Sequence, residues 1–322
     1  MPASGPWWCS NIGGKNGLGS TMKKYLFLIA LGVGSLTTQA QQKVIAFISD
    51  TQAPMTVEKI WLKPHNNQVA TGKLFEDILT TMPTQLFILG DVVSLGYQKK
   101  KWLAMDEYLT QCRISGISVS AILGNHDVIG NGAKGERLFQ QRFPNHVRTG
   151  YFVVVDSVAT VLLNSNFSKM GNDAVAQEEV WLVKTLTQLD KDPAIKATIV
   201  TCHHAPYTNS TIVKPNTQVQ EKFVSAFSQS AKGALFITGH AHAFEHFKVN
   251  GKNFLTIGGG GGLHQPLRTG NGQQEDLAAG YKPMFHYLIL ERHGSKVTIT
   301  SRYLSDDFGA VLSGYSFTIA AP

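Results

Sequence analysis

The sequence is predicted to adopt an α/β fold, and three observations lead to this class. Short apolar runs rich in β-branched residues alternate with longer segments of helical periodicity. A hydrophobic fraction of 43% with 16% charged residues is typical of a globular protein with a sizeable core. Polar clusters follow several predicted strands, where ligands bind in α/β sheets. No internal repeat or linker interrupts the pattern, so we expect a single domain over residues 41–322.

The predicted elements begin as strand, helix, strand, helix and strand. Apolar, β-branched content indicates strands at 43–49, 85–89 and 117–123, and the spacing of apolar side chains indicates helices at 68–80 and 100–112. The remaining elements are a short helix at 136–142, a hairpin of strands 151–155 and 159–164, a helix at 172–189, strands at 196–201, 234–238, 244–249 and 254–257, and an antiparallel pair at 285–291 and 296–303. The apolar face of the helix at 172–189 is expected to consist of Val175, Val180, Leu182, Val183 and Leu186.

The first forty residues are typical of a targeting signal with an extension before it. Residues 22–24 form a short basic region, residues 25–34 are apolar, and residues 38–40 are a typical cleavage site. We therefore expect an unstructured upstream extension at 1–21, a signal peptide at 22–40, and export to the periplasm or secretion. The apolar run is too short to span a bilayer, so no stable membrane anchor is expected.

The charge of the chain argues against nucleic acid as a partner, and its cysteines leave a disulfide undecided. Of the net charge of +7, three positive charges lie before residue 41, which leaves a modest +4. The only basic cluster is Lys99–Lys101, without interleaved aromatic residues, so nucleic acid is not indicated as a partner. Cys112 and Cys202 are expected to be buried, and the sequence does not decide whether a disulfide joins them.

Five polar clusters stand at the ends of predicted strands. They are Asp50-Thr51-Gln52, Gly90-Asp91, Gly124-Asn125-His126-Asp127, Cys202-His203-His204-Ala205-Pro206 and Gly239-His240-Ala241-His242. Taken alone, an Asp after a strand usually caps a turn, and a His pair usually packs in the core or lies on the surface. Together, carboxylates, an amide and imidazoles are donors that suit Zn, Mn or Fe. Their joint occurrence at strand ends predicts a metal centre.

This series of motifs resembles the calcineurin-like metallophosphoesterases, which include the purple acid phosphatases, over residues 44 to about 260. The resemblance implies a four-layer α/β/β/α sandwich of two mixed sheets with a dinuclear metal centre of Fe, Mn or Zn. It implies that one metal is bound by Asp50 and His242, the other by Asn125, His204 and His240, and that Asp91 bridges the two. His204 is preferred over His203 because residues 204–210 match the His-x-Pro-x-x-Asn-Ser stretch of purple acid phosphatases.

The resemblance also assigns catalytic roles and shows two departures. His126 is expected to face the substrate and to protonate the leaving oxygen or stabilise the transition state, and Asp127 to orient its imidazole. Gln52 stands where many relatives have His, and Ser94 where purple acid phosphatases have Tyr. Either Gln52 binds the first metal through its amide oxygen, or a water takes that place.

We therefore expect a phosphomonoesterase or phosphodiesterase that acts on a small-molecule or exposed phosphate ester through a metal-activated water or hydroxide. The alternative is a non-catalytic, metal-poor member that binds a phosphorylated ligand or partner, which Gln52 and Ser94 favour. The glycine run Gly258–Gly262 is expected to pass beside the metal-binding strands and line the substrate cleft, with His264 as a contact. Substrate, metal identity and oligomeric state stay open.

Overall fold

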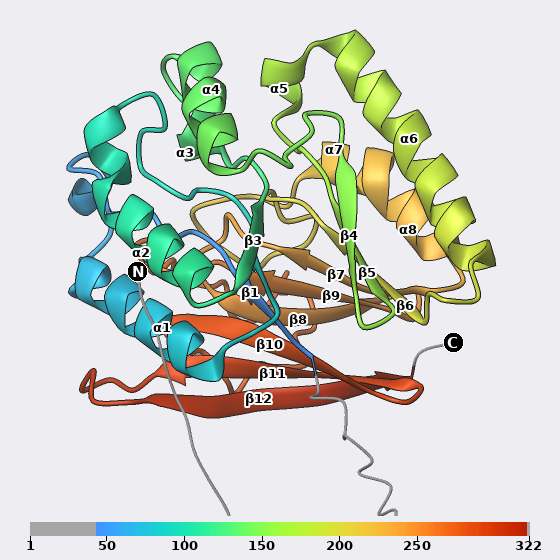
Figure 1. Cartoon of the computed structure of the whole chain (residues 1–322). Helices are drawn as coiled ribbons and strands as arrows, with labels where there is room; N and C mark the ends of the chain where they lie inside the picture. The colour runs from blue at the N-terminus through green and yellow to red at the C-terminus, as the bar shows by residue number, and fades with distance from the viewer. Residues whose placement is uncertain (1–42, 321–322) are drawn as a thin grey trace, which may run out of the picture. The chain divides into compact units, whose positions relative to one another are not determined.

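The computed structural model describes residues 43–320, which form two six-stranded sheets (Figure 1). The predictions for residues 1–21 and 22–40 lie outside the described residues. Among the helices that the structure describes, none is long and apolar enough to cross a membrane.

Both sheets are mixed. The first has the order β12-β11-β10-β1-β2-β3, and β1, β2 and β3 are parallel. Its strands are β1 (Val44–Ile48), β2 (Gln85–Ile88), β3 (Ser118–Ala121), β10 (His286–His293), β11 (Lys296–Leu304) and β12 (Val311–Ala320). The second has the order β4-β5-β6-β7-β9-β8, with antiparallel strands at both edges. Its strands are β4 (Tyr151–Val155), β5 (Val158–Leu162), β6 (Ala197–Thr201), β7 (Gly233–Thr238), β8 (Phe244–Val249) and β9 (Lys252–Ile257).

Helices cover the outer face of each sheet: α1 and α2 lie on the first, and α6 and α8 on the second (Figure 1). The helices are η1 (Glu58–Ile60), α1 (Asn67–Thr81), η2 (Lys99–Trp102), α2 (Leu103–Ile114), α3 (Asn125–Val128), α4 (Gly132–Arg142), α5 (Phe167–Met170), α6 (Asn172–Lys191), α7 (Thr217–Val219), η3 (Gln220–Val224) and α8 (Ser225–Gln229).

The inner strands of the first sheet, such as β1, are buried on both faces. On β1, Phe47 points into the core between the sheets and stacks on Phe87 of β2 at 5.1 Å between ring centroids. Its neighbours Ala46 and Ile48 point to the opposite side, against α1 and α2. Successive side chains of a strand alternate between faces, so such a strand needs an unbroken apolar run. This double burial creates the four α/β/β/α layers, and the predicted fold class is confirmed.

The predicted hairpin about Asp156 and Ser157 is present as β4 and β5, and both turn residues have positive φ angles, of 47° and 62°. That conformation matches the twist of paired strands. On α6, however, two predictions were wrong, because Val180 and Val183 are 70% and 55% exposed. The helix turns them away from the sheet, and its buried apolar residues are Val175, Leu182, Leu186 and Leu189.

Strand β12 was not expected from the sequence. It pairs with β11 at the edge of the first sheet, where Tyr315, Phe317 and Ile319 are half-buried and the residues between them are exposed. This alternation is a strand signal, but serines and a glycine weaken it. Cys112 and Cys202 are both buried and free, in separate cores against the two sheets, so they form no disulfide with each other.

Glu178 of α6 is a fully buried carboxyl that holds the end of β5. Its Oε1 accepts a hydrogen bond of 2.7 Å from the backbone N–H of Asn164, while Oε2 has no partner within the described residues. Burial raises the pKa of Glu178 from 4.5 to about 8. The folded protein therefore keeps this proton over a pH range in which the unfolded chain has lost it, so unfolding releases a proton and stability falls as pH rises from about 4.5 to 8.

Replacing Glu178 with Gln should remove this loss. We expect Glu178→Gln to differ little from the wild type near pH 4.5 and to become more stable than it by a few kcal/mol near pH 8, since one pKa unit is worth about 1.4 kcal/mol. Denaturant unfolding across this pH range measures the difference. The exposed Glu107→Gln serves as the control and should show no such trend. A constant offset between Glu178→Gln and the wild type would contradict the prediction.

Candidate metal centre

The ends of strands from both sheets meet through backbone hydrogen bonds. Asp50 N–H donates to Gly90 O at 3.1 Å, and Gln52 N–H donates to Asp91 O at 3.1 Å, which joins the segments after β1 and β2. His240 N–H donates to both carboxylate oxygens of Asp50, at 3.2 and 3.0 Å, which joins the second sheet to the first. The polar clusters that follow β1, β2 and β7 are therefore in direct contact.

Three residues of this contact have a backbone conformation that L-amino acids rarely adopt. Asp50, Asp91 and His240 have φ angles of 58°, 48° and 67°. Residues in the left-handed region are uncommon and cost about 1–3 kcal/mol each, so the surrounding structure must hold them there. A Cβ on Gly124 would overlap the backbone nitrogen and Oδ1 of Asp91, so only glycine permits this approach.

One group of acceptors surrounds His203. The Nδ1 atom of this buried ring lies 2.9 Å from Leu89 O, so Nδ1 carries the proton and Nε2 presents a lone pair. Nε2 lies 3.2 Å from Asp91 Oδ2 and 3.2 Å from Asn125 Oδ1. Ligand atoms of Asp91, His203 and His240 all lie within 4.8 Å of one another. These four side chains are placed to hold a metal ion.

A second group of acceptors surrounds His242. Its Nδ1 lies 2.7 Å from Leu263 O, and its Nε2 lies 3.2 Å from Asp50 Oδ1. The side-chain amide of Gln52 is best placed in the orientation in which its Nε2 donates hydrogen bonds to Asp50 O at 3.1 Å and Asp91 O at 2.9 Å. In that orientation Oε1 takes the position 3.4 Å from His242 Nε2. The amide oxygen of Gln52 then faces the same point as Asp50 and His242.

The electrostatics of the site fit a cation. Burial alone would raise the pKa of Asp91, but His203 and His126 lower it below its usual value. Burial would lower the pKa of His203, but the carboxylate of Asp91 raises it to about 9. The carboxylates of Asp91 and Asp50 raise the pKa of His203 and His242, so each of these pairs favours a positive charge between carboxylate and imidazole. A proton on Nε2 or a metal ion bound to it can supply that charge. The donor set of O and N atoms suits first-row metals.

The structure favours His203 over His204 as the residue that faces the metal. Nδ1 of His204 lies 2.8 Å from Ser165 Oγ, which also accepts a hydrogen bond from the His204 backbone N–H at 3.0 Å. Its ring packs against His240 at 4.5 Å between centroids, outside the group formed with Asp91. The geometry therefore favours His203, whereas the motif in the sequence favours His204.

His126 lies where the sequence places it, at the open side of the centre. Its Nδ1 lies 3.2 Å from Ser94 O, and its Nε2 lies 3.9 Å from Asp91 Oδ2 and 3.6 Å from Glu58 Oε1. Glu58 was not predicted as a site residue, because it belongs to a short helix without apolar periodicity or a motif. Its nearness in space to His126 could be found only from the fold.

The orienting role predicted for Asp127 requires correction. Its carboxylate accepts hydrogen bonds from the backbone N–H groups of Gly124 at 2.9 Å and of Val92 and Val93 at 3.3 Å. The imidazole of His126 is instead held by Ser94 O. Burial and the nearby Asp91 carboxylate raise the pKa of Asp127 to about 7. Asp127 therefore shapes the backbone that carries Asp91 and Asn125.

The glycine run passes close to the centre, as the sequence predicts. Gly260 N–H donates to Ser49 O at 2.9 Å and Gly262 N–H to Asp50 O at 2.8 Å, and a Cβ on Gly262 would overlap the ring of His242. His264 does not line the cavity over the centre; its neighbour Gln265 does. The run therefore supports the metal-facing residues from behind.

A cavity of about 360 Å³ opens over both groups of acceptors. Its lining residues are Glu58, Trp61, Leu62, Asp91, Asn125, His126, Ile212, Val213, His240, His242 and Gln265. No tyrosine is among them in the described part of the chain, and the Ser94 hydroxyl is buried nearby without a partner there. This volume is within the range of small-molecule sites.

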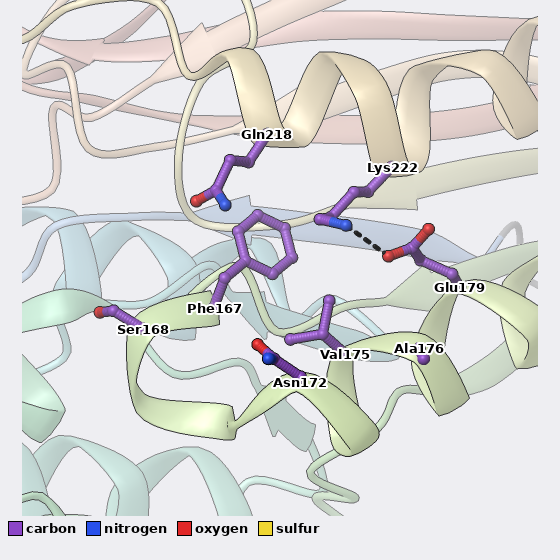
Figure 2. A pocket seen from close by; sticks show the side chains of 8 residues that line it. All are labelled: Phe167, Ser168, Asn172, Val175, Ala176, Glu179, Gln218 and Lys222. Carbon is purple, nitrogen blue, oxygen red and sulfur yellow. Dashed lines mark hydrogen bonds and ion pairs between the residues drawn. The ribbon is translucent and has the colours of Figure 1, made fainter.

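A second cavity, of about 370 Å³, lies between α5, the start of α6, α7 and η3 (Figure 2). Phe167 and Val175 form its apolar side, with Gln218 opposite. Its one lysine, Lys222, is paired with Glu179 at 2.6 Å. That ammonium group is thus already neutralised, and none of the metal-facing residues line this cavity.

Comparisons with known proteins agree with this fold. A family model described as calcineurin-like phosphoesterase matches residues 43–244. No curated protein matches the sequence significantly. Among solved structures, a purple acid phosphatase from yellow lupin (Lupinus luteus) seeds is 16% identical, with a TM-score of 0.64 over 88% of this chain and 54% of that one, so this chain spans about half of its length.

Two further structures match most of their own length. The protein described as the anchor in the inner membrane complex of Plasmodium is 15% identical, with a TM-score of 0.61 over 87% of this chain and 89% of that one. A dimetal phosphatase from Danio rerio is 12% identical, with a TM-score of 0.55 over 87% of this chain and 99% of that one. At these identities the likeness shows the fold alone.

The two neighbouring histidines can be distinguished by metal content. We expect His203→Ala to lose about one metal ion per chain relative to the wild type, because it removes the Nε2 ligand beside Asp91. His204→Ala, which removes a ring held by Ser165, should keep the wild-type content and serves as the matched control. Elemental analysis of both purified variants, with thermal unfolding to verify folding, measures this. Loss of metal in His204→Ala alone would restore the first assignment.

Proposed function

The chain belongs to the calcineurin-like phosphoesterase family, and from this premise we propose that it is a metal-dependent hydrolase of phosphoric esters. One observation carries the proposal: Asp91, Asn125, His203 and His240 gather around one point, and Asp50, Gln52 and His242 gather around a second, with Gln52 in contact with the backbone of Asp91. Two neighbouring groups of oxygen and nitrogen donors suit a dinuclear centre of Fe, Mn or Zn.

When bound, the two metal ions would supply an activated water and neutralise charge on the phosphoryl oxygens. The protein's own residues would do the rest. Asp91 Oδ1 is held by the backbone N–H of His126 at 2.7 Å, which leaves Oδ2 directed at His203. His126, fixed through Nδ1 by Ser94 O, presents Nε2 to the cavity, where it can give a proton to the leaving oxygen.

The substrate and the location are also proposals. The cavity suits a small-molecule or exposed phosphate ester, either a monoester or a diester, because it is open beside His126 and of small-molecule size. Export to the periplasm or secretion follows from the signal peptide predicted at residues 22–40. A phosphatase in that location would act on phosphate esters outside the cytoplasm.

A non-catalytic role is the second candidate. One neighbour in fold is described as an anchor in a membrane complex, so the fold also occurs in a protein described by its attachment role. The acceptor group of Asp50, Gln52 and His242 supports this alternative, because Gln52 offers a neutral amide where many relatives have an imidazole. In that case the site would hold one metal ion or none, and the cavity would bind a phosphorylated ligand or partner without turnover.

The variant Asp91→Asn tests the proposed hydrolase. We expect wild-type protein to contain about two metal ions per chain and to hydrolyse a chromogenic phosphomonoester or diester. Asp91→Asn should lose at least one metal ion and about 1000-fold in kcat/KM, because a neutral amide would hold a cation less well than a carboxylate. Asp173→Asn, at an exposed position of α6, is the control. Absence of metal and of turnover in wild-type protein supplied with Fe, Mn or Zn would favour the second candidate.

The cavity lining also predicts the colour of an iron-loaded protein. Fe(III)–tyrosinate absorption requires a tyrosine ligand, and Ser94 stands at the position where purple acid phosphatases have one. We therefore expect the protein loaded with Fe(III) to show no intense visible band in its absorption spectrum. An intense visible band would mean that a tyrosine from elsewhere in the chain binds the metal.

A further inference from the structure

Two chain segments give the cavity over the metal centre an apolar lining, and each is called a wall below. Trp61 and Leu62 come from the segment after η1, and Ile212 and Val213 from the segment after β6. Phosphoryl transfer at the metal centre needs oxygen and nitrogen ligands and a proton donor, so it gives no reason for these four side chains. Side chains that line the cavity but bind no metal are placed to contact the part of the substrate that lies beyond its phosphate group.

These apolar side chains are also exposed to a degree that needs explanation. Trp61 is 79% exposed and Ile212 49%, and Ile60 beside Trp61 is 70% exposed. A group of exposed, large apolar residues at the mouth of a cavity marks a surface that a ligand covers, because leaving it in water gives up the free energy of burial. Here the cavity joins that surface to His126 and the metal-facing residues.

Both walls are held in place before any ligand binds. The backbone N–H groups of Ile212 and Val213 donate to Ser210 Oγ at 3.1 and 3.2 Å, and Ser210 in turn donates to Gln265 Oε1 at 2.6 Å. On the other side, the N–H groups of Trp61 and Leu62 donate to Glu58 O at 3.1 and 2.9 Å. Walls fixed in this way lose little conformational entropy on binding.

The charge of the cavity limits the substrate further. Apart from the metal-facing Asp91, Glu58 is the one carboxylate among its described lining, and neither lysine nor arginine occurs there. Lys59 lines a different cavity. Glu58 Oε1 lies 3.6 Å from His126 Nε2, close to where a leaving alcohol would be protonated. An alcohol carrying a second phosphate or a carboxylate would be repelled there.

We propose that the substrate is a phosphate ester of an uncharged, apolar alcohol, alkyl or aryl, which packs against Trp61 and Leu62 of one wall and Ile212 and Val213 of the other. This inference rests on the proposed hydrolase function. The bond between phosphorus and the alcohol oxygen breaks, a bond between phosphorus and the water oxygen forms, and a proton from His126 goes to the alcohol while water returns one to His126. The products are the free alcohol and inorganic phosphate.

A series of n-alkyl phosphates from methyl to hexyl tests the inference, because their alcohols have similar acidity and differ only in apolar length. We expect kcat/KM to rise roughly threefold for each added methylene group until the walls are covered. An ester of similar size whose alcohol carries a second phosphate should react at least tenfold more slowly. A flat series with ready hydrolysis of methyl phosphate would overturn the inference and leave the hydrolase function intact.

The double variant Trp61→Ala, Ile212→Ala should flatten the gradient between methyl and hexyl phosphate. Ile114→Ala, at an exposed apolar position of α2 that is 82% exposed and does not line the cavity, should keep it. Affinity for n-alkylphosphonates, measured by calorimetry, repeats the test without turnover. If no ester is hydrolysed but these affinities rise with chain length, the hydrolase function fails and the apolar site stands. Affinities independent of chain length would overturn the site.

Discussion

The metal centre depends on two imidazole rings that backbone carbonyls fix in one orientation. Leu89 O and Leu263 O accept from Nδ1 of His203 and His242, which leaves both Nε2 lone pairs facing buried carboxylates. Acceptors that face one another in a dry environment repel unless a cation or a proton lies between them. The sheets, the tight glycine contacts and the left-handed residues all hold these atoms together. A role in holding this group of acceptors in turn explains why the unfavourable left-handed conformations are present.

Two facing sheets are well suited to hold such a group. Each parallel strand ends at the same edge of its sheet, and packing the sheets face to face brings two such edges together. The left-handed conformations of Asp50, Asp91 and His240 each cost about 1–3 kcal/mol. Burial of residues such as Phe47 and Phe87 between the sheets offsets this cost, since fully burying one such side chain contributes about 1.5–3 kcal/mol.

The sequence points to strand ends as the place of the site, but it does not decide which face of a strand a side chain takes. On β6 and the residue after it, Ile199 points between the sheets, whereas Val200 and Cys202 point toward α6. His203 continues the inward set and His204 the outward set, because side chains alternate. Every residue of β6 is buried, so its sequence does not reveal which face is inward. Glu58 and Trp61, in a segment with no period or motif, are placed only by the fold.

If the proposed function is correct, chemistry and selectivity have different structural origins in this protein. The metal-facing residues sit at the ends of buried strands, where many backbone hydrogen bonds fix each atom. The apolar walls sit in two loops, one held by the side chain of Ser210 and the other by the backbone carbonyl of Glu58, whose side chain also accepts a hydrogen bond from Met55 N–H. Because Glu58 also reaches His126 from its loop, the same residue holds one wall and places a carboxyl group beside His126. A change in that loop therefore alters the shape and the charge of the cavity together, while the ligand set at the strand ends stays as it is.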